Sequence, residues 1–187
     1  MKKAIVFILF GMLVMTHAWM VSAGEKAPQK VVDLAQSELA KVGTDPVIVA
    51  AVKAENGKGK SLDQIKAKDK EWKATAGVAD YMKAIMESEC GNHLKKIQDG
   101  KAYYAEIFVM DNQGANVAMT DKTSDYWQGD EAKFKKSFKG GAGAVFIDEV
   151  EFDDSAQAYL VQISVPVKDN GKVIGAITFG IDVDKIE

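Results

Sequence analysis

Residues 158–182 read AYLVQISVPVKDNGKVIGAITFGID, and they carry the clearest structural pattern in the chain. Side chains of a β-strand alternate between the two faces of a sheet. In residues 159–167 every odd position is apolar, and residues 173–181 repeat this pattern with one glycine. The segment Asp169-Asn-Gly171 between them has the composition of a tight turn. The stretch therefore predicts an antiparallel hairpin with one continuously apolar face.

Other strand-like segments precede this hairpin. They lie at Tyr103–Met110, Asn116–Thr120 and Ala144–Ile147, and Glu149–Phe152 either continues the third segment or pairs with it. Asp111-Asn-Gln-Gly114 is a turn sequence between the first two. Short connections of this kind join antiparallel neighbours. We therefore expect a five-stranded antiparallel sheet.

The first half of the mature chain has helical periodicity instead. Apolar residues recur at steps of three and four from Val31 to Val42, and Gly43 ends that segment. Asp45 and Pro46 predict a helix start, with Asp45 as N-cap. The segment Ser61-Leu-Asp-Gln64 has capping-box spacing and opens a long helical region that ends near Ile97.

The predicted fold class is accordingly α+β. Long N-terminal helices, at residues 24–100, pack on the apolar face of the sheet formed by residues 101–187. We expect residues 24–187 to form one domain, because about 164 residues can build a proper core.

Residues 1–23 have the features of a secretory signal peptide. Lys2 and Lys3 give a positive start, Ala4–Met15 is apolar, and Val21-Ser-Ala23 fits a small-residue cleavage site. An uncleaved anchor is the alternative, because residues 4–23 are nearly long enough to span a bilayer. Cleavage is favoured, which predicts a periplasmic protein.

The net charge and the cysteine content limit the kinds of binding partner that the sequence supports. Without the two signal lysines the formal net charge goes from −3 to about −5, which argues against a nucleic-acid partner. Cys90 is the sole cysteine, so no internal disulfide can form, although this thiol could pair two chains. We expect a monomer or a weak homodimer.

The segment Thr123–Glu131, TSDYWQGDE, has the densest cluster of recognition-type side chains. We expect it to cross the sheet as a loop, on the face that is small or polar in composition, and to wall a small-molecule pocket. Close packing of the loop on small residues is the alternative. Asp130 can contact a ligand or cap the next helix, and we expect one aromatic inside the pocket, preferably Trp127. The candidate ligand-binding residues on loop and sheet are Ser124, Tyr126, Trp127, Gln128, Asp130, Glu106, Phe108, Gln162, Ser164, Thr178 and Asp182.

Three segments resemble the extracytoplasmic Cache, or PDC, sensor domains of bacteria, which have a PAS-like fold. They are Glu106–Asp111 with Gly114, Asp125–Glu131, and Val173–Asp182, within a resemblance that covers about residues 31–181. The resemblance implies binding of an amino acid, amine or organic acid between sheet and loop. It places Tyr126, Trp127 and Asp130 in the ligand-contacting loop, and it matches Asp182 to a strand-end acid that meets a ligand amine in some members.

One departure from that family concerns signalling. The sequence ends five residues after Asp182, where many members continue into a transmembrane helix. The resemblance then implies a free-standing sensor domain that passes its ligand state to a membrane receptor or sensor kinase.

Other function classes find little support. The sequence has no nucleophile elbow, metalloprotease motif or phosphate loop, so we expect no enzyme and no cofactor. Cys90 and His93 have the spacing of two metal ligands, but further ligands are not evident, and we expect no metal. The remaining alternative is a protein-interaction module that uses Tyr126 and Trp127 as an exposed hot spot.

Overall fold

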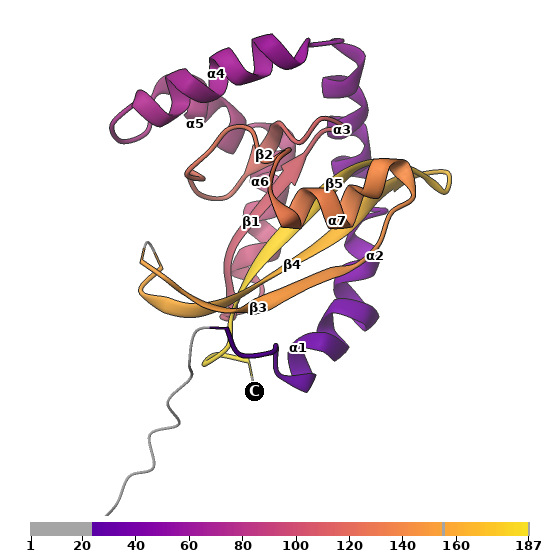
Figure 1. The fold of residues 1–187 in the computed structure, drawn as a ribbon, viewed down its shortest axis with the longest axis vertical. Helices are drawn as coiled ribbons and strands as arrows, with labels where there is room; N and C mark the ends of the chain where they lie inside the picture. The colour runs from indigo at the N-terminus through magenta and orange to yellow at the C-terminus, as the bar shows by residue number, and fades with distance from the viewer. Residues whose placement is uncertain (1–23, 155, 187) are drawn as a thin grey trace, which may run out of the picture.

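A computed structural model describes residues 24–154 and 156–186; the expected signal peptide lies outside the described residues. Its sheet is five-stranded and antiparallel, with strand order β2-β1-β5-β4-β3 (Figure 1). The strands are β1 Tyr104–Met110, β2 Asn116–Met119, β3 Phe146–Asp153, β4 Ala158–Asp169 and β5 Lys172–Asp182. The expected fold class is confirmed. The two segments proposed for the third strand form one strand, β3, with a bulge between Ile147 and Val150.

The apolar face packs on most of the N-terminal helices, as the alternation predicted. These are α1 Gln29–Leu34, the π-helical turn η1 Ala35–Leu39, α2 Ala40–Val42, α3 Pro46–Gly57 and α6 Glu89–Asp99. Their buried residues Leu39, Ile48 and Leu94 form one core with Ile163 and Phe179 of the sheet. Burial of this continuous apolar surface is the main stabilising term of the fold.

Local signals set the helix boundaries. Asp45 caps α3 by accepting hydrogen bonds from the backbone N–H groups of Val47 and Ile48. Gly43 ends the preceding helix where a Cβ atom would lie 2.2 Å from the carbonyl oxygen of Pro166, so only glycine fits there.

The second face of the sheet is covered by different elements. Helices α4 Leu62–Ala74 and α5 Asp80–Met86 lie on this side, together with residues 123–131, which we call the crossing loop (Figure 1). Trp72 of α4 and Tyr126 of the loop join Phe108 and Met110 of β1 in a second apolar cluster. Ser61 and Gln64 form the expected capping box of α4. The region predicted as one long helical stretch from Ser61 to Ile97 is divided into α4, α5 and α6, and Gly77 lies between α4 and α5.

Helix α7 Ala132–Phe138 and the 3-10 turn η2 Lys139–Gly141 complete this side. The N-cap of α7 is Glu131, with no side-chain cap, so the expectation that Asp130 caps this helix is wrong. In the described range no helix combines the length and apolar character needed to cross a bilayer.

Candidate functional site

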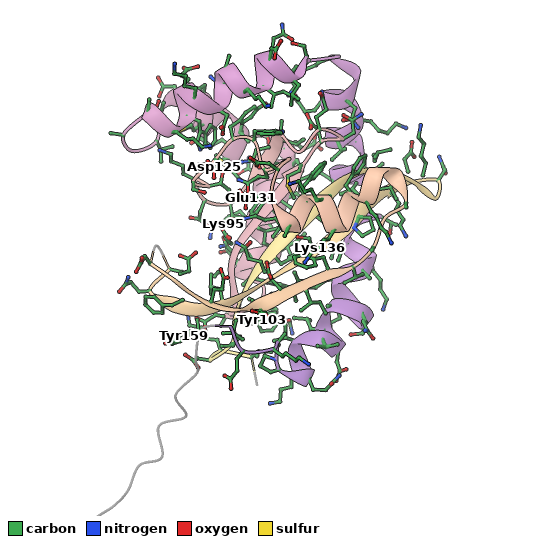
Figure 2. The ribbon with its side chains drawn as sticks, viewed as in Figure 1. Lys95, Tyr103, Asp125, Glu131, Lys136 and Tyr159 are labelled. Carbon is green, nitrogen blue, oxygen red and sulfur yellow. The ribbon has the colours of Figure 1, made fainter. Side chains whose placement is uncertain are left out.

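A cavity of about 350 Å³ opens between the crossing loop and the second face of the sheet. We call it the main cavity. Figure 2 labels Asp125 and Glu131 on the crossing loop and Tyr159 on the β3–β4 hairpin. The cavity is lined by Trp72, Lys73, Glu106, Phe108, Lys122, Thr123, Ser124, Gln128, Lys133, Asp153 and Gln162.

The floor of the main cavity is a row across three strands. Glu106 of β1 and Gln162 of β4 both pair with Gly180 of β5. Because Gly180 has no side chain, Glu106 extends over it, where a Cβ atom would lie 2.7 Å from Glu106 Cγ. Glu106 Oε1 accepts a hydrogen bond of 3.2 Å from Gln162 Nε2. The small-residue face therefore makes a hollow with a polar base.

The electrostatics of the floor favour a cation above it. Burial raises the pKa of Glu106, and the neighbouring negative charge of Asp153 raises it further. Lys133 opposes this shift, but its Nζ is 2.9 Å from Glu131 and is therefore shared. A ligand ammonium beside Glu106 would stabilise the ionised carboxylate.

Two lysines line the opposite side of the cavity. Lys73 Nζ lies 2.8 Å from Asp69 and 2.6 Å from Asp125, which partly neutralise it. Lys122 Nζ donates hydrogen bonds to two backbone carbonyl groups, those of Thr75 at 2.7 Å and Gly77 at 2.8 Å. In the described part of the chain Lys122 has no carboxylate partner, so its positive charge is available to an anionic group.

Gln128 supplies a buried acceptor without a partner. The residue is 1 % exposed, and its Nε2 donates a hydrogen bond of 2.8 Å to the carbonyl oxygen of Asp125. Its Oε1 accepts no hydrogen bond from any described residue. Buried polar atoms are rarely left unpaired in native proteins. A ligand N–H group in the main cavity would satisfy this atom.

Helix α4 holds the crossing loop in place. Asp69 Oδ1 accepts hydrogen bonds from the backbone N–H groups of Tyr126, at 2.9 Å, and Trp127, at 3.0 Å. Trp72 Nε1 donates a hydrogen bond of 2.7 Å to the carbonyl oxygen of Thr123. Asp69, Trp72 and Lys73 share one face of α4 because they are three and four residues apart. That spacing is the one signal in the sequence that could have placed these three residues together at the site, and they were not among the predicted site residues.

The two aromatic residues of the loop do not line the main cavity. Tyr126 packs against Trp72 with ring centroids 5.7 Å apart and the rings tilted by 39°, and its hydroxyl accepts a hydrogen bond from Lys60. Trp127 Nε1 donates a hydrogen bond of 2.8 Å to the carbonyl oxygen of Gln113, and Lys66 lies over its ring. The expectation that Trp127 points into the pocket is therefore wrong. Nor are the two rings an exposed pair, since Tyr126 is 6 % exposed and Trp127 is partly buried.

The other candidate ligand-binding residues fall into two groups, those that line the main cavity and those that lie outside it. Glu106, Phe108, Ser124, Gln128 and Gln162 line the main cavity. Four candidates lie outside it, each for a reason that only the packed structure shows. Ser164 and Thr178 hydrogen-bond each other at 2.7 Å and are fully buried, on the sheet face that packs against α7. Asp182 pairs with Lys185 at 2.7 Å, and Asp130 is exposed to solvent.

Cys90 and His93 lie on helix α6, which packs on the opposite face of the sheet from the main cavity. Burial raises the pKa of the Cys90 thiol to about 12, which keeps it protonated and inert. His93 Nε2 lies 2.9 Å from Asp45 Oδ2 and ties α6 to the start of α3. Within residues 24–154 and 156–186, no group of three or more side chains could hold a metal ion.

In this fold a loop and a helix close over one face of a sheet and enclose a cavity. Residues 63–187 match the family model described as methyl-accepting chemotaxis protein-like, first PDC sensor domain. The chain therefore belongs to the family of PDC sensor domains, as its sequence resemblance suggested. No curated protein matches the sequence significantly.

Solved sensor domains are similar in fold at low sequence identity. The Vibrio cholerae histidine kinase DctB sensor domain is 12 % identical with a TM-score of 0.42, over 84 % of this chain and 52 % of that one. The sensory domain of the Campylobacter jejuni chemoreceptor Tlp3 is 15 % identical with a TM-score of 0.43, over 84 % and 64 %. The ligand-binding domain of the Pseudomonas aeruginosa amino acid chemoreceptor PctC, in complex with GABA, is 10 % identical with a TM-score of 0.38, over 85 % and 63 %. This chain thus spans between about half and two thirds of these solved chains.

Proposed function

We propose that this PDC domain binds a small zwitterion, with the carboxylate and ammonium groups of an α-amino acid, in the main cavity. The observation that carries this proposal is the unpartnered Oε1 of Gln128, a buried acceptor in a cavity that has charges of both signs. An ammonium group is the ligand chemistry that supplies N–H donors to such an acceptor.

The distribution of charge supports the same ligand. Lys122, just before the crossing loop, and Lys73 of α4 both reach the cavity, where they suit a carboxylate. Glu106 and Asp153 reach it from the sheet, where they suit an ammonium group. A plain organic acid would leave Glu106 facing a second negative charge, and a plain amine would leave Lys122 without a counter-ion. The zwitterion satisfies both sides.

The setting of this binding is extracytoplasmic sensing. The signal-peptide features of residues 1–23 and membership of a sensor family support export to the periplasm. We propose that ligand occupancy is passed to a membrane receptor or sensor kinase, as the chemotaxis description of the family model suggests. The domain itself then acts as a binding module and not as an enzyme.

A thermal-shift screen of the purified protein with the twenty common amino acids tests this function. A ligand at 100 times its dissociation constant adds about 2.7 kcal/mol to the free energy of unfolding, which is readily detected. Failure of every amino acid to stabilise the protein would refute the proposal.

Variants then locate the site. Lys122→Met and Gln128→Met should each weaken binding of the best amino acid by about tenfold, because each removes one polar contact to a charged ligand group. Lys66→Met is the matched control, since Lys66 lies over Trp127 and outside the cavity. An equal loss of affinity in the control would place the ligand elsewhere.

A further inference from the structure

A second hollow adjoins the main cavity along the edge of the sheet. The two share Lys133, Asp153 and Gln162 as lining residues. The second hollow has a volume of about 230 Å³. A ligand seated over the floor of the main cavity therefore has the second hollow next to it, on the other side of Gln162.

This second hollow is strongly acidic, and we call it the acidic arm. Its carboxylates come from the start of α7 and from β3: Glu131, Asp148, Glu149, Glu151 and Asp153. Lys133 is the lysine among its lining residues, and it pairs with Glu131. Asp148, Glu149 and Glu151 form no ion pair with any described residue.

The backbone of β3 explains how these acids gather. The bulge between Ile147 and Val150 takes Asp148 and Glu149 out of the regular ladder with β4. A bulge breaks the strict alternation of side chains, so neighbouring residues can face the same region. Edge strands often carry charges that deter pairing with another sheet, but either sign serves that purpose. Carboxylates gathered around a hollow beside the main cavity instead select a cation.

We propose that the ligand is a diamino acid, an α-amino acid whose side chain ends in a second cationic nitrogen. This inference rests on the proposed function, because it uses the same main cavity for the α-carboxylate and α-ammonium groups. The carboxylate lies toward Lys122, the α-ammonium group contacts Gln128 Oε1 above Glu106, and the side-chain cation lies in the acidic arm. A neutral side chain of equal length would leave the acidic arm without a counter-ion.

Calorimetric titration of the purified protein with L-lysine, L-ornithine and L-norleucine tests the inference. Norleucine keeps the α-amino acid group and the chain length of lysine, without the terminal amine. Lysine or ornithine should bind about tenfold more tightly than norleucine, because a charge-assisted contact adds to affinity. The double variant Glu149→Gln with Glu151→Gln should remove most of this difference and leave norleucine unaffected.

A matched double variant, Glu87→Gln with Glu89→Gln, changes the net charge equally at positions outside the arm. It should keep the preference for lysine; losing it there would show that net charge alone produced the preference. Norleucine binding as tightly as lysine and ornithine would overturn the inference and leave the proposed function standing. Absence of binding by all three would overturn the inference, and the thermal-shift screen of the twenty amino acids then decides whether the proposed function stands. Cadaverine, which lacks the carboxylate, should bind at least about tenfold more weakly than lysine, and equal binding would contradict the placement at Lys122.

Discussion

At the scale of single residues, burial of Glu106 lowers the stability of the unliganded protein, and the same carboxylate is the proposed contact of the ligand ammonium group. Burial raises the pKa of Glu106, so its ionised form is less favourable in the folded protein than in the unfolded chain. Ionisation of this carboxyl therefore lowers the stability of the unliganded protein as the pH rises above the ordinary pKa of glutamate. A ligand ammonium group above the floor would offset that cost.

We predict that Glu106→Gln stabilises the unliganded protein at neutral pH. The gain should vanish as the pH falls below the ordinary pKa of glutamate, where the carboxyl is protonated in both states. Denaturant unfolding at several pH values checks this, and Gln162 Nε2 can still donate to the amide oxygen that replaces the carboxylate in the variant. A variant less stable than the parent at neutral pH would show that the charge of Glu106 is already compensated.

The same substitution should weaken amino acid binding by about tenfold, because the ammonium group loses its carboxylate. Affinity of the parent protein should also fall as the pH is lowered through the raised pKa of Glu106, since the protonated form no longer attracts a cation. Titration calorimetry across the acidic range measures both effects. Affinity that is independent of pH in that range would contradict the assignment of Glu106 to the ligand ammonium group.

At the scale of elements, α4 is the support of the crossing loop. Asp69 is buried and accepts both backbone N–H groups of Tyr126 and Trp127, so Asp69→Ala leaves two donors without a partner. We predict a loss of about 3 kcal/mol in the free energy of unfolding. Glu71→Ala is the control on the same helix, because Glu71 is exposed and pairs with Lys68 at the surface; it should cost about 0.5 kcal/mol or less. Equal effects in urea unfolding would show that α4 does not hold the loop.

The elements also show what the sequence could predict. Strand alternation and turn residues located the sheet, and Asp45 and Ser61 marked the starts of α3 and α4. Helical periodicity shows that a helix has an apolar side, but not which face of the sheet that side covers. For this reason the position of α4 and α5 on the cavity side appeared only in the structure.

The site was predicted in part, for a related reason. Polar residues on the second face of β1 and β4, such as Glu106 and Gln162, follow from alternation. Lys73 and Lys122 look like ordinary solvated lysines in the sequence, and only packing brings them to the cavity. Trp127 is a residue type that often contacts ligands, but its hydrogen bond to Gln113 holds the side chain away from the main cavity.

At the scale of the whole molecule, one face of the sheet builds the core and the other face forms the cavity. The first face joins the long helices in a continuous apolar core, and the second face joins α4, the crossing loop and α7 around the main cavity. The proposed ligand contacts come from both the sheet and the loop. Binding should therefore stabilise the contact between α4 and the sheet, and amide hydrogen exchange in residues 62–74 should slow when the ligand is present. Unchanged exchange in that segment would mean that α4 does not respond to the ligand.

The most direct test of the central claim is a crystal structure of the protein with its best-binding amino acid. We expect the ligand in the main cavity, with its carboxylate at Lys122 Nζ and its ammonium group donating to Gln128 Oε1 above Glu106. A ligand bound beyond the crossing loop, between Lys60 and Tyr126, or one whose carboxylate faces Glu106, would contradict the account.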